Sequence, residues 1–197
     1  MLRLSTEEFA EPSEPIDKGR ELRQLRQELR RVRADRRLGD DERELSRTLR
    51  ASRERIAREV GQLHACARCA AAYPLPASTW DGGYCCSGRT DALFDELELA
   101  ALGQAGTRPR HLRPPRSAAA GCIFRGPTGC SLAPEHRPNK CLRYLCAGAQ
   151  RELHERGALE QVEALCQDNE QQFAHYARCR IARLEEIFCD DLLGWLR

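Results

Sequence analysis

Apolar residues in the first third of the chain recur at spacings of three and four, with arginine and glutamate filling most positions between them. One run contains Leu22, Leu25, Leu29 and Val32, and the next contains Leu45, Leu49, Ile56, Val60 and Leu63. This spacing predicts two amphipathic helices, because it places one apolar stripe on each. Gly39 and Asp40 lie between the runs, where glycine suits the end of one helix and aspartate the start of the next. We expect residues 16–64 to form an antiparallel hairpin of the coiled-coil type.

The helical spacing returns after Cys146. A short helix is expected to end at Gly157, and a long one follows whose buried side carries Leu159, Val162, Cys166, Phe173, Tyr176, Leu184, Ile187 and Trp195. We expect residues 147–197 to pack along the hairpin. The predicted fold class is therefore mainly α: a long helical hairpin and a C-terminal helix in a coiled-coil-like stalk, with an irregular, metal-stapled, cysteine-rich head.

The proposed head, residues 65–146, breaks the helical pattern. It contains eight of the 11 cysteines and eight of the 10 prolines, and only Thr90 to Leu102 shows helical spacing. Such a segment buries too little apolar surface to offset the entropy of ordering it, so we expect it to need metal ligation. Residues 1–15 are acidic and are predicted to form a disordered tail.

Composition also indicates where in the cell the protein is expected to reside. The 32 basic and 30 acidic side chains nearly cancel, so net charge indicates no particular partner. The first residues lack the apolar core of a secretory signal, and no stretch approaches the about 18 apolar residues that span a bilayer. We therefore expect a cytoplasmic protein with no membrane contact, whose cysteines bind metal in preference to forming disulfides.

The head cysteines occur in four clusters among turn-forming residues: Cys66 with Cys69, Cys85 with Cys86, Cys122 with Cys130, and Cys141 with Cys146. The first is a C-x2-C pair, whose spacing lets both sulfurs face one ion from a tight turn. Eight thiolates suit two tetrahedral zinc ions, or one or two iron–sulfur clusters, so the expected cofactor is zinc or an iron–sulfur cluster. The alternative is a set of buried, inert thiols that pack as small apolar groups.

The order of these motifs resembles the YkgJ-type cysteine-cluster proteins, whose domain is described as zinc- or iron-chelating. The resemblance covers residues 66–146, and its most specific part is Gly129-Cys130-Ser131-Leu132 followed by Arg137-Pro138 and Cys141. It departs from the family signature in one spacing, because 15 residues instead of two separate Cys69 from Cys85. The resemblance implies metal-ligand roles for Cys66, Cys69, Cys85, Cys86, Cys122, Cys130, Cys141 and Cys146.

Other residues with metal or anion chemistry lie outside this ligand set. Cys166, Cys179 and Cys189 fall on the predicted C-terminal helix, where we expect burial for Cys166. Two histidines, His64 and His136, lie close to head cysteines and are alternative ligands. A proline-rich loop contains four arginines and no acidic residue, which suits a phosphate or an acidic partner: Arg108, Arg110, Arg113 and Arg116. The arginine-rich run 20–37 is interpreted as a solvated helix face.

These features leave three functional hypotheses. The first is a metal-binding accessory module whose helical hairpin binds a protein partner or a second copy. The second is an iron–sulfur protein that transfers electrons or modifies a protein side chain, its chemistry residing in the cluster. The weaker third is an RNA- or ribosome-associated factor that uses the arginines. No nucleotide-binding or hydrolase motif appears in the sequence, so the chain itself does not indicate an enzyme class.

Overall fold

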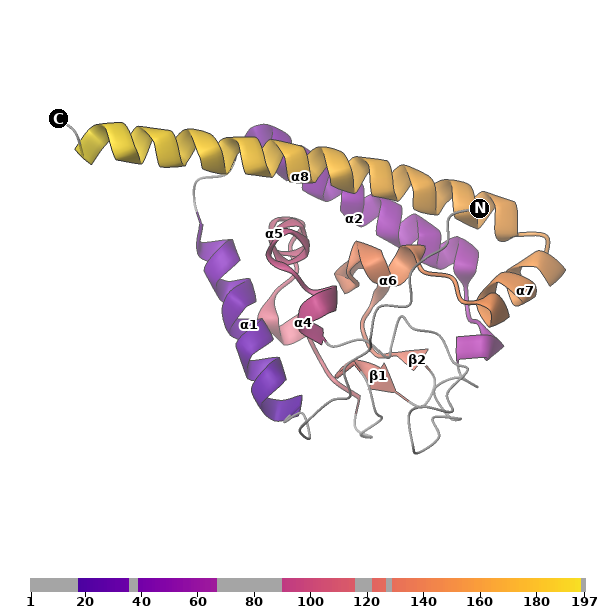
Figure 1. The fold of residues 1–197 in the computed structure, drawn as a ribbon. Coiled ribbons are helices and arrows are strands. Elements are labelled where there is room, and N and C mark those ends of the chain that lie inside the picture. Colours follow the sequence, from indigo (N-terminus) through magenta and orange to yellow (C-terminus); the bar gives the residue numbers. More distant parts are fainter. Residues whose placement is uncertain (1–17, 36–38, 67–89, 116–121, 127–128, 196–197) are drawn as a thin grey trace, which may run out of the picture.

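The computed structural model describes residues 18–35, 39–66, 90–115, 122–126 and 129–195. The chain is mainly helical, as predicted (Figure 1). The helices are α1 (Lys18–Ala34), α2 (Asp40–Val60), α4 (Thr90–Leu93), α5 (Glu96–Gln104), α6 (Asn139–Arg143), α7 (Ala147–Glu155) and α8 (Leu159–Trp195). Two short 3-10 helices, Pro109–His111 and Pro134–His136, accompany an antiparallel pair of strands, β1 (Arg125–Gly126) and β2 (Gly129–Cys130).

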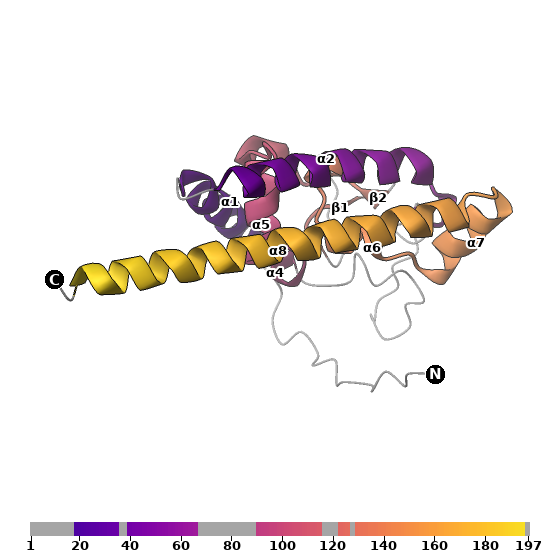
Figure 2. The same ribbon diagram turned by 90° about the horizontal axis from the view of Figure 1, so that it is seen from above.

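Helices α2 and α8 run antiparallel along each other for most of the length of α2 (Figure 2). Asn169 of α8 donates a hydrogen bond to Ser52 of α2 at 3.1 Å. Further along α8, toward its C-terminus, Arg180 lies 3.4 Å from Glu42 of α2. Their apolar stripes meet in one buried cluster, which also takes in α6 and α7: Ile56, Leu63, Leu142, Ala149, Leu153, Val162, Leu165 and Cys166. The expected packing of the C-terminal helix along the N-terminal helices is thus seen for α2.

Helix α1 forms as predicted, but the prediction that it pairs with α2 is wrong. Its main neighbour is α5, and Figure 1 shows it running steeply away from α2 and α8. Gly103 permits the close approach: a Cβ there would lie 3.0 Å from Arg33 Cγ and 3.3 Å from Leu29 Cδ1. Because α8 already covers the apolar stripe of α2, the stripe of α1 is buried elsewhere, with Leu25 and Leu29 4% and 0% exposed. The predicted stripe is therefore not an open partner surface.

The described part of the cysteine-rich region shares its core with the helices. Leu25 and Leu29 of α1 belong to the same buried cluster as Phe94, Leu102, Leu112, Cys122, Ile123, Phe124 and Leu132. Phe94 and Phe124 pack with their ring centroids 5.5 Å apart. These residues are thus packed into an apolar core with the helices, whereas the sequence led us to expect too little apolar burial to order this segment without metal.

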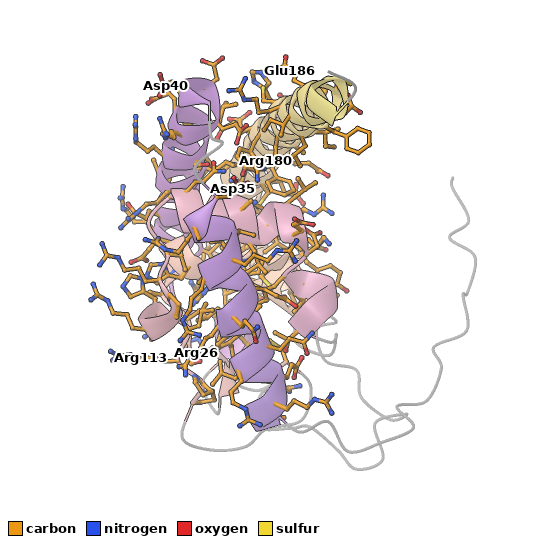
Figure 3. The ribbon with its side chains drawn as sticks, turned by 90° about the vertical axis from the view of Figure 1, so that its left-hand side faces the viewer. Arg26, Asp35, Asp40, Arg113, Arg180 and Glu186 are labelled. Atoms are coloured by element: carbon orange, nitrogen blue, oxygen red, sulfur yellow. The ribbon has the colours of Figure 1, made fainter. Side chains whose placement is uncertain are left out.

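An ion-pair network joins α8 to α2 and to the residue that follows α1. Arg180 of α8 donates to Asp35 at 2.7 Å and reaches Glu42 at 3.4 Å. Figure 3 shows Arg180 pointing toward Asp35 where α1 ends. The three side chains are all at least mostly buried, so the pairing fixes how the end of α1 meets α8.

Candidate metal centre

The residues in and beside strands β1 and β2 carry one of the cysteine clusters and are linked by local hydrogen bonds. The amide of Arg125 donates to Cys122 O, and the amide of Ser131 donates to Phe124 O. Gly129 has φ +113°, a backbone conformation that residues other than glycine rarely adopt. Cys130 is half-buried beside the α1 core, and Cys122 is buried within it.

Three cysteine-bearing turns that are far apart in sequence lie side by side. A Cβ placed on Gly129, next to Cys130, would lie 3.7 Å from Cys66 Cβ. A Cβ on Gly148, two residues after Cys146, would lie 3.3 Å from the Cβ of Ala65, the residue before Cys66. The two glycines thus allow close backbone approach around Cys66. The fold therefore brings the turns that carry Cys66, Cys130 and Cys146 to one edge of the molecule.

A carboxylate from α7 holds the first of these turns. Glu152 accepts hydrogen bonds from the amides of His64 and Ala65, at 3.0 and 2.9 Å. The two amide donors lower the pKa of Glu152 to about 2, with further help from the His64 ring and Arg156. Arg156 also donates to the carbonyl of Gln62 at 2.7 Å, so this ion pair fixes the chain just before Cys66.

A second carboxylate holds the turn that leads to Cys141. Glu98 of α5 is fully buried and accepts from the amide and side-chain nitrogens of Asn139, at 3.0 and 2.9 Å. The amide of Lys140 donates to it at 3.3 Å. Burial raises the pKa of Glu98, while these donors and the nearby charge of Arg53 oppose that rise. The start of α6, and with it half-buried Cys141, is thereby attached to the helical core.

The predicted ligand set is only partly placed. Cys69, Cys85 and Cys86 lie outside the described residues. Within the described ranges, no three His, Cys, Asp or Glu side chains form a group that could hold a metal ion. Cys66, Cys130 and Cys146 occupy neighbouring turns, and Cys122 and Cys141 belong to elements that pack into the same body.

The two alternative histidine ligands have other contacts. His136 is buried, hydrogen-bonds through Nδ1 to Thr107 Oγ1 at 3.0 Å, and stacks on His111 with centroids 4.3 Å apart. Burial lowers the pKa of His136, which favours the neutral ring. The His64 ring is largely exposed and lies 3.2 Å from Glu152. Both rings thus have protein partners of their own.

The three cysteines of α8 differ in how far they are exposed. Cys166 is buried, and its thiol donates to Leu142 O at 3.5 Å, which confirms the expected burial. Desolvation raises the pKa of Cys166 to about 11, so the thiol stays protonated and unreactive at neutral pH. Cys179 is half-buried and Cys189 is exposed further along the helix.

The arginines of the proline-rich loop and those of α1 differ in their contacts. Arg108, Arg110 and Arg113 are exposed around the Pro109–His111 turn, whereas Arg116 lies outside the described residues. Two arginines of the 20–37 run donate to carbonyls, which the interpretation of a solvated face missed: Arg33 to Gly103 and Thr107, and Arg26 to Leu112 at 2.7 Å. Figure 3 shows Arg26 and Arg113 on this face. Their regular helical spacing gave no sign of such contacts.

Comparison with known proteins adds no relative. No protein-family model matches the chain, and no significant match is found among curated proteins or among solved structures. The helices that the structure describes include none with the length and apolar character needed to cross a bilayer.

Proposed function

We propose that this chain is a metal-binding cysteine-cluster protein that acts as a binding or accessory module. Thiolates from the 66–146 region would hold zinc or an iron–sulfur cluster, with the helices as the scaffold. The observation that carries the proposal is the convergence of the turns bearing Cys66, Cys130 and Cys146 at one edge, although these residues are separated by up to 80 positions in the sequence. Cysteines on separate turns are a typical donor set for both cofactors.

The scaffold supports the proposal through its carboxylates. Glu152 caps the turn before Cys66, and Glu98 caps the turn before Cys141. Capping groups that orient the backbone of a ligand-bearing turn reduce the entropy lost when the metal binds. The helical core would thus present part of the site in the metal-free protein, and ligation would add to its stability.

Thiolate donors bind both zinc and iron–sulfur clusters, so the same cysteines could hold either one. Zinc would make the site structural and leave the protein a binding module. An iron–sulfur cluster would supply electron-transfer chemistry, and the chain's own residues would then hold the cluster, orient it and exclude water.

Metal content measured on protein purified without oxygen tests the proposal. We expect either about two zinc ions per chain with no visible absorption, or iron with acid-labile sulfide and a broad band near about 400 nm. Cys130→Ser and Cys146→Ser should each lower the metal content. Cys189→Ser, an exposed cysteine on α8, is the matched control and should leave the metal content unchanged. A wild-type protein without metal, or equal loss in all three variants, would contradict the proposal.

A further inference from the structure

Helix α1 separates its charges on the two sides of its apolar stripe. At about 100° per residue, Arg26, Arg30 and Arg33 fall within an arc of about 60° on one side of the stripe. The two acidic residues of the helix, Glu21 and Glu28, fall on the other side. The helix thus presents a row of three arginines, about 10 Å long at 1.5 Å per residue.

The proline-rich loop after α5 packs against this row. Arg26 and Arg33 donate hydrogen bonds to carbonyl groups of the loop, Leu112 O at 2.7 Å and Thr107 O at 2.8 Å. The side chain of Leu112 is fully buried in the core beside α1. These contacts fix the backbone of the loop, so its side chains lose less conformational entropy when they bind a partner.

Three more arginines lie on the short 3-10 turn of this loop. Arg108, Arg110 and Arg113 are exposed, and none of them forms an ion pair with a carboxylate of the described residues. Burial lowers the pKa of the His111 ring, and the positive charges of the three arginines lower it further, against the opposing effect of Glu135. Like charges held together without a carboxylate partner repel one another, so a bound anion would lower the free energy of this turn.

The two groups form one basic surface, called here the arginine surface: Arg26, Arg30, Arg33, Arg108, Arg110 and Arg113. Figure 3 shows Arg26 of α1 and Arg113 of the loop at the same edge of the molecule. Guanidinium groups bind phosphate oxygens through paired hydrogen bonds. Successive phosphates of a nucleic-acid strand are about 3.4 Å apart along the helix axis, so one strand reaches several of these arginines. A single phosphate group does not.

The exposed side chains favour contact with the backbone of a nucleic acid over contact with its bases. Proteins that bind unpaired bases stack them on aromatic side chains. In the described part of the chain, the exposed large hydrophobic residues are Tyr144, Ile181 and Phe188, which belong to α8 or follow α6. The arginine surface contains none of them. A duplex suits such a surface, because its bases stay stacked and its phosphates face outward.

We propose that the arginine surface binds the phosphate backbone of a nucleic-acid duplex without reading its sequence. Arg30, Arg108, Arg110 and Arg113 contact phosphates directly, while the arginines that donate to the loop carbonyls hold the loop beside α1. Each phosphate contact releases counterions, so the affinity falls as salt rises. This function is separate from metal binding, because the arginine surface contains no cysteine.

Fluorescence anisotropy of the full chain with labelled DNA and RNA duplexes of about 20 base pairs tests the proposal. We expect a dissociation constant of about 1–100 µM at low salt, rising with salt concentration. The double variant Arg30→Ala with Arg110→Ala should weaken binding at least about tenfold and lower the salt slope by about two. Its matched control, Arg151→Ala with Arg178→Ala, removes two exposed arginines from α7 and α8 and should change neither quantity. Circular dichroism of both variants confirms that the helices are retained.

Two competitor ligands make the test specific. Polyglutamate of similar charge represents an acidic protein partner, and equal or tighter binding to it would overturn the assignment to nucleic acid. Tighter binding to a single strand of the same length would overturn the choice of a duplex. No binding at low salt, or equal losses in the two double variants, would overturn the arginine surface as the site. Metal content should stay at the wild-type value in both variants, which keeps failure here distinct from failure of the cysteine site.

Discussion

Two carboxylates perform the same structural task in different surroundings. Glu98 is fully buried between α5 and α6 and caps the turn before Cys141, whereas the side chain of Glu152 is 13% exposed beside the exposed His64 and caps the turn before Cys66. Burial raises the pKa of Glu98, while amide donors lower the pKa of Glu152 to about 2. The comparison teaches that hydrogen bonding to a turn stabilises a carboxylate only to the extent that desolvation does not oppose it.

The difference also determines what happens when each group is removed. Loss of Glu98 would leave the buried nitrogen donors of Asn139 without their acceptor, and it would leave the buried guanidinium of Arg53, which is 0% exposed, without a nearby negative charge. Two of the Arg53 nitrogens already lack a hydrogen-bond partner among the described residues. Around Glu152, whose side chain is 13% exposed, water can reach the amide of the exposed His64 when the carboxylate is removed. We therefore expect the two sites to respond very differently.

The largest effect is expected for Glu98→Ala. The change leaves Arg53 as a buried charge without a nearby anion, so the free energy of unfolding should fall by about 3–5 kcal/mol. Urea unfolding followed by circular dichroism measures this loss. Glu96→Ala, at an exposed position on the same helix, is the control. A loss in Glu98→Ala no larger than in the control would show that the buried carboxylate is not needed.

An intermediate effect is expected in a double-mutant cycle that joins Glu98→Gln with Arg53→Met. Each single change leaves one buried partner uncompensated, whereas the pair removes both charges together. The double variant should be more stable than the sum of the single losses predicts, by about 1–3 kcal/mol. Strict additivity in the unfolding free energies would mean that Arg53 and Glu98 do not interact.

A smaller effect is expected for Glu152→Gln, and it should depend on pH. Because the pKa of Glu152 is lowered from 4.5 to about 2 in the folded protein, its contribution is complete above about pH 4.5 and is lost as pH falls through about 2. The stability difference between wild type and variant should therefore close as the solution is acidified across that range. A difference that stays constant down to the lowest pH would refute the assignment of that pKa.

The smallest expected change concerns reactivity instead of stability. The pKa of Cys166 is raised to about 11, whereas Cys189 is exposed on the same helix. Alkylation near neutral pH, followed by mass spectrometry of peptides, should label Cys189 quickly and Cys166 only when the protein unfolds. Equal labelling rates in the folded protein would show that the α8 core opens around Cys166.

Periodicity predicted helices well and their partners poorly. The spacing of Leu45, Leu49 and Ile56 correctly indicated α2, and that of Val162, Cys166 and Tyr176 indicated α8. The same rule predicted α1 but paired it with α2, whereas its main neighbour is α5. An apolar stripe shows that one face of a helix is buried, but it does not indicate which element buries it. Gly103 on α5 carried the missing signal, since its lack of a side chain permits α1 to approach.

The cysteine clusters show a similar division. Their turn-rich setting predicted irregular backbone around Cys130, and Gly129 adopts a positive φ there. Neither carboxylate was foreseen. Glu98 carried a signal, since it interrupts the apolar stretch of α5, whereas Glu152 lies in a polar helix and carried none.

The sequence by itself determined where helices form, which faces are apolar and where thiols concentrate, because spacing and composition act locally. Only the tertiary structure decided that α1 packs on α5, that Glu98 and Glu152 cap the cysteine-bearing turns, and that arginines of α1 and of the proline-rich loop share one face. Those outcomes depend on contacts between residues 40 or more positions apart. Such contacts are selected by which surfaces fit together once every helix has formed, and no local pattern records that choice.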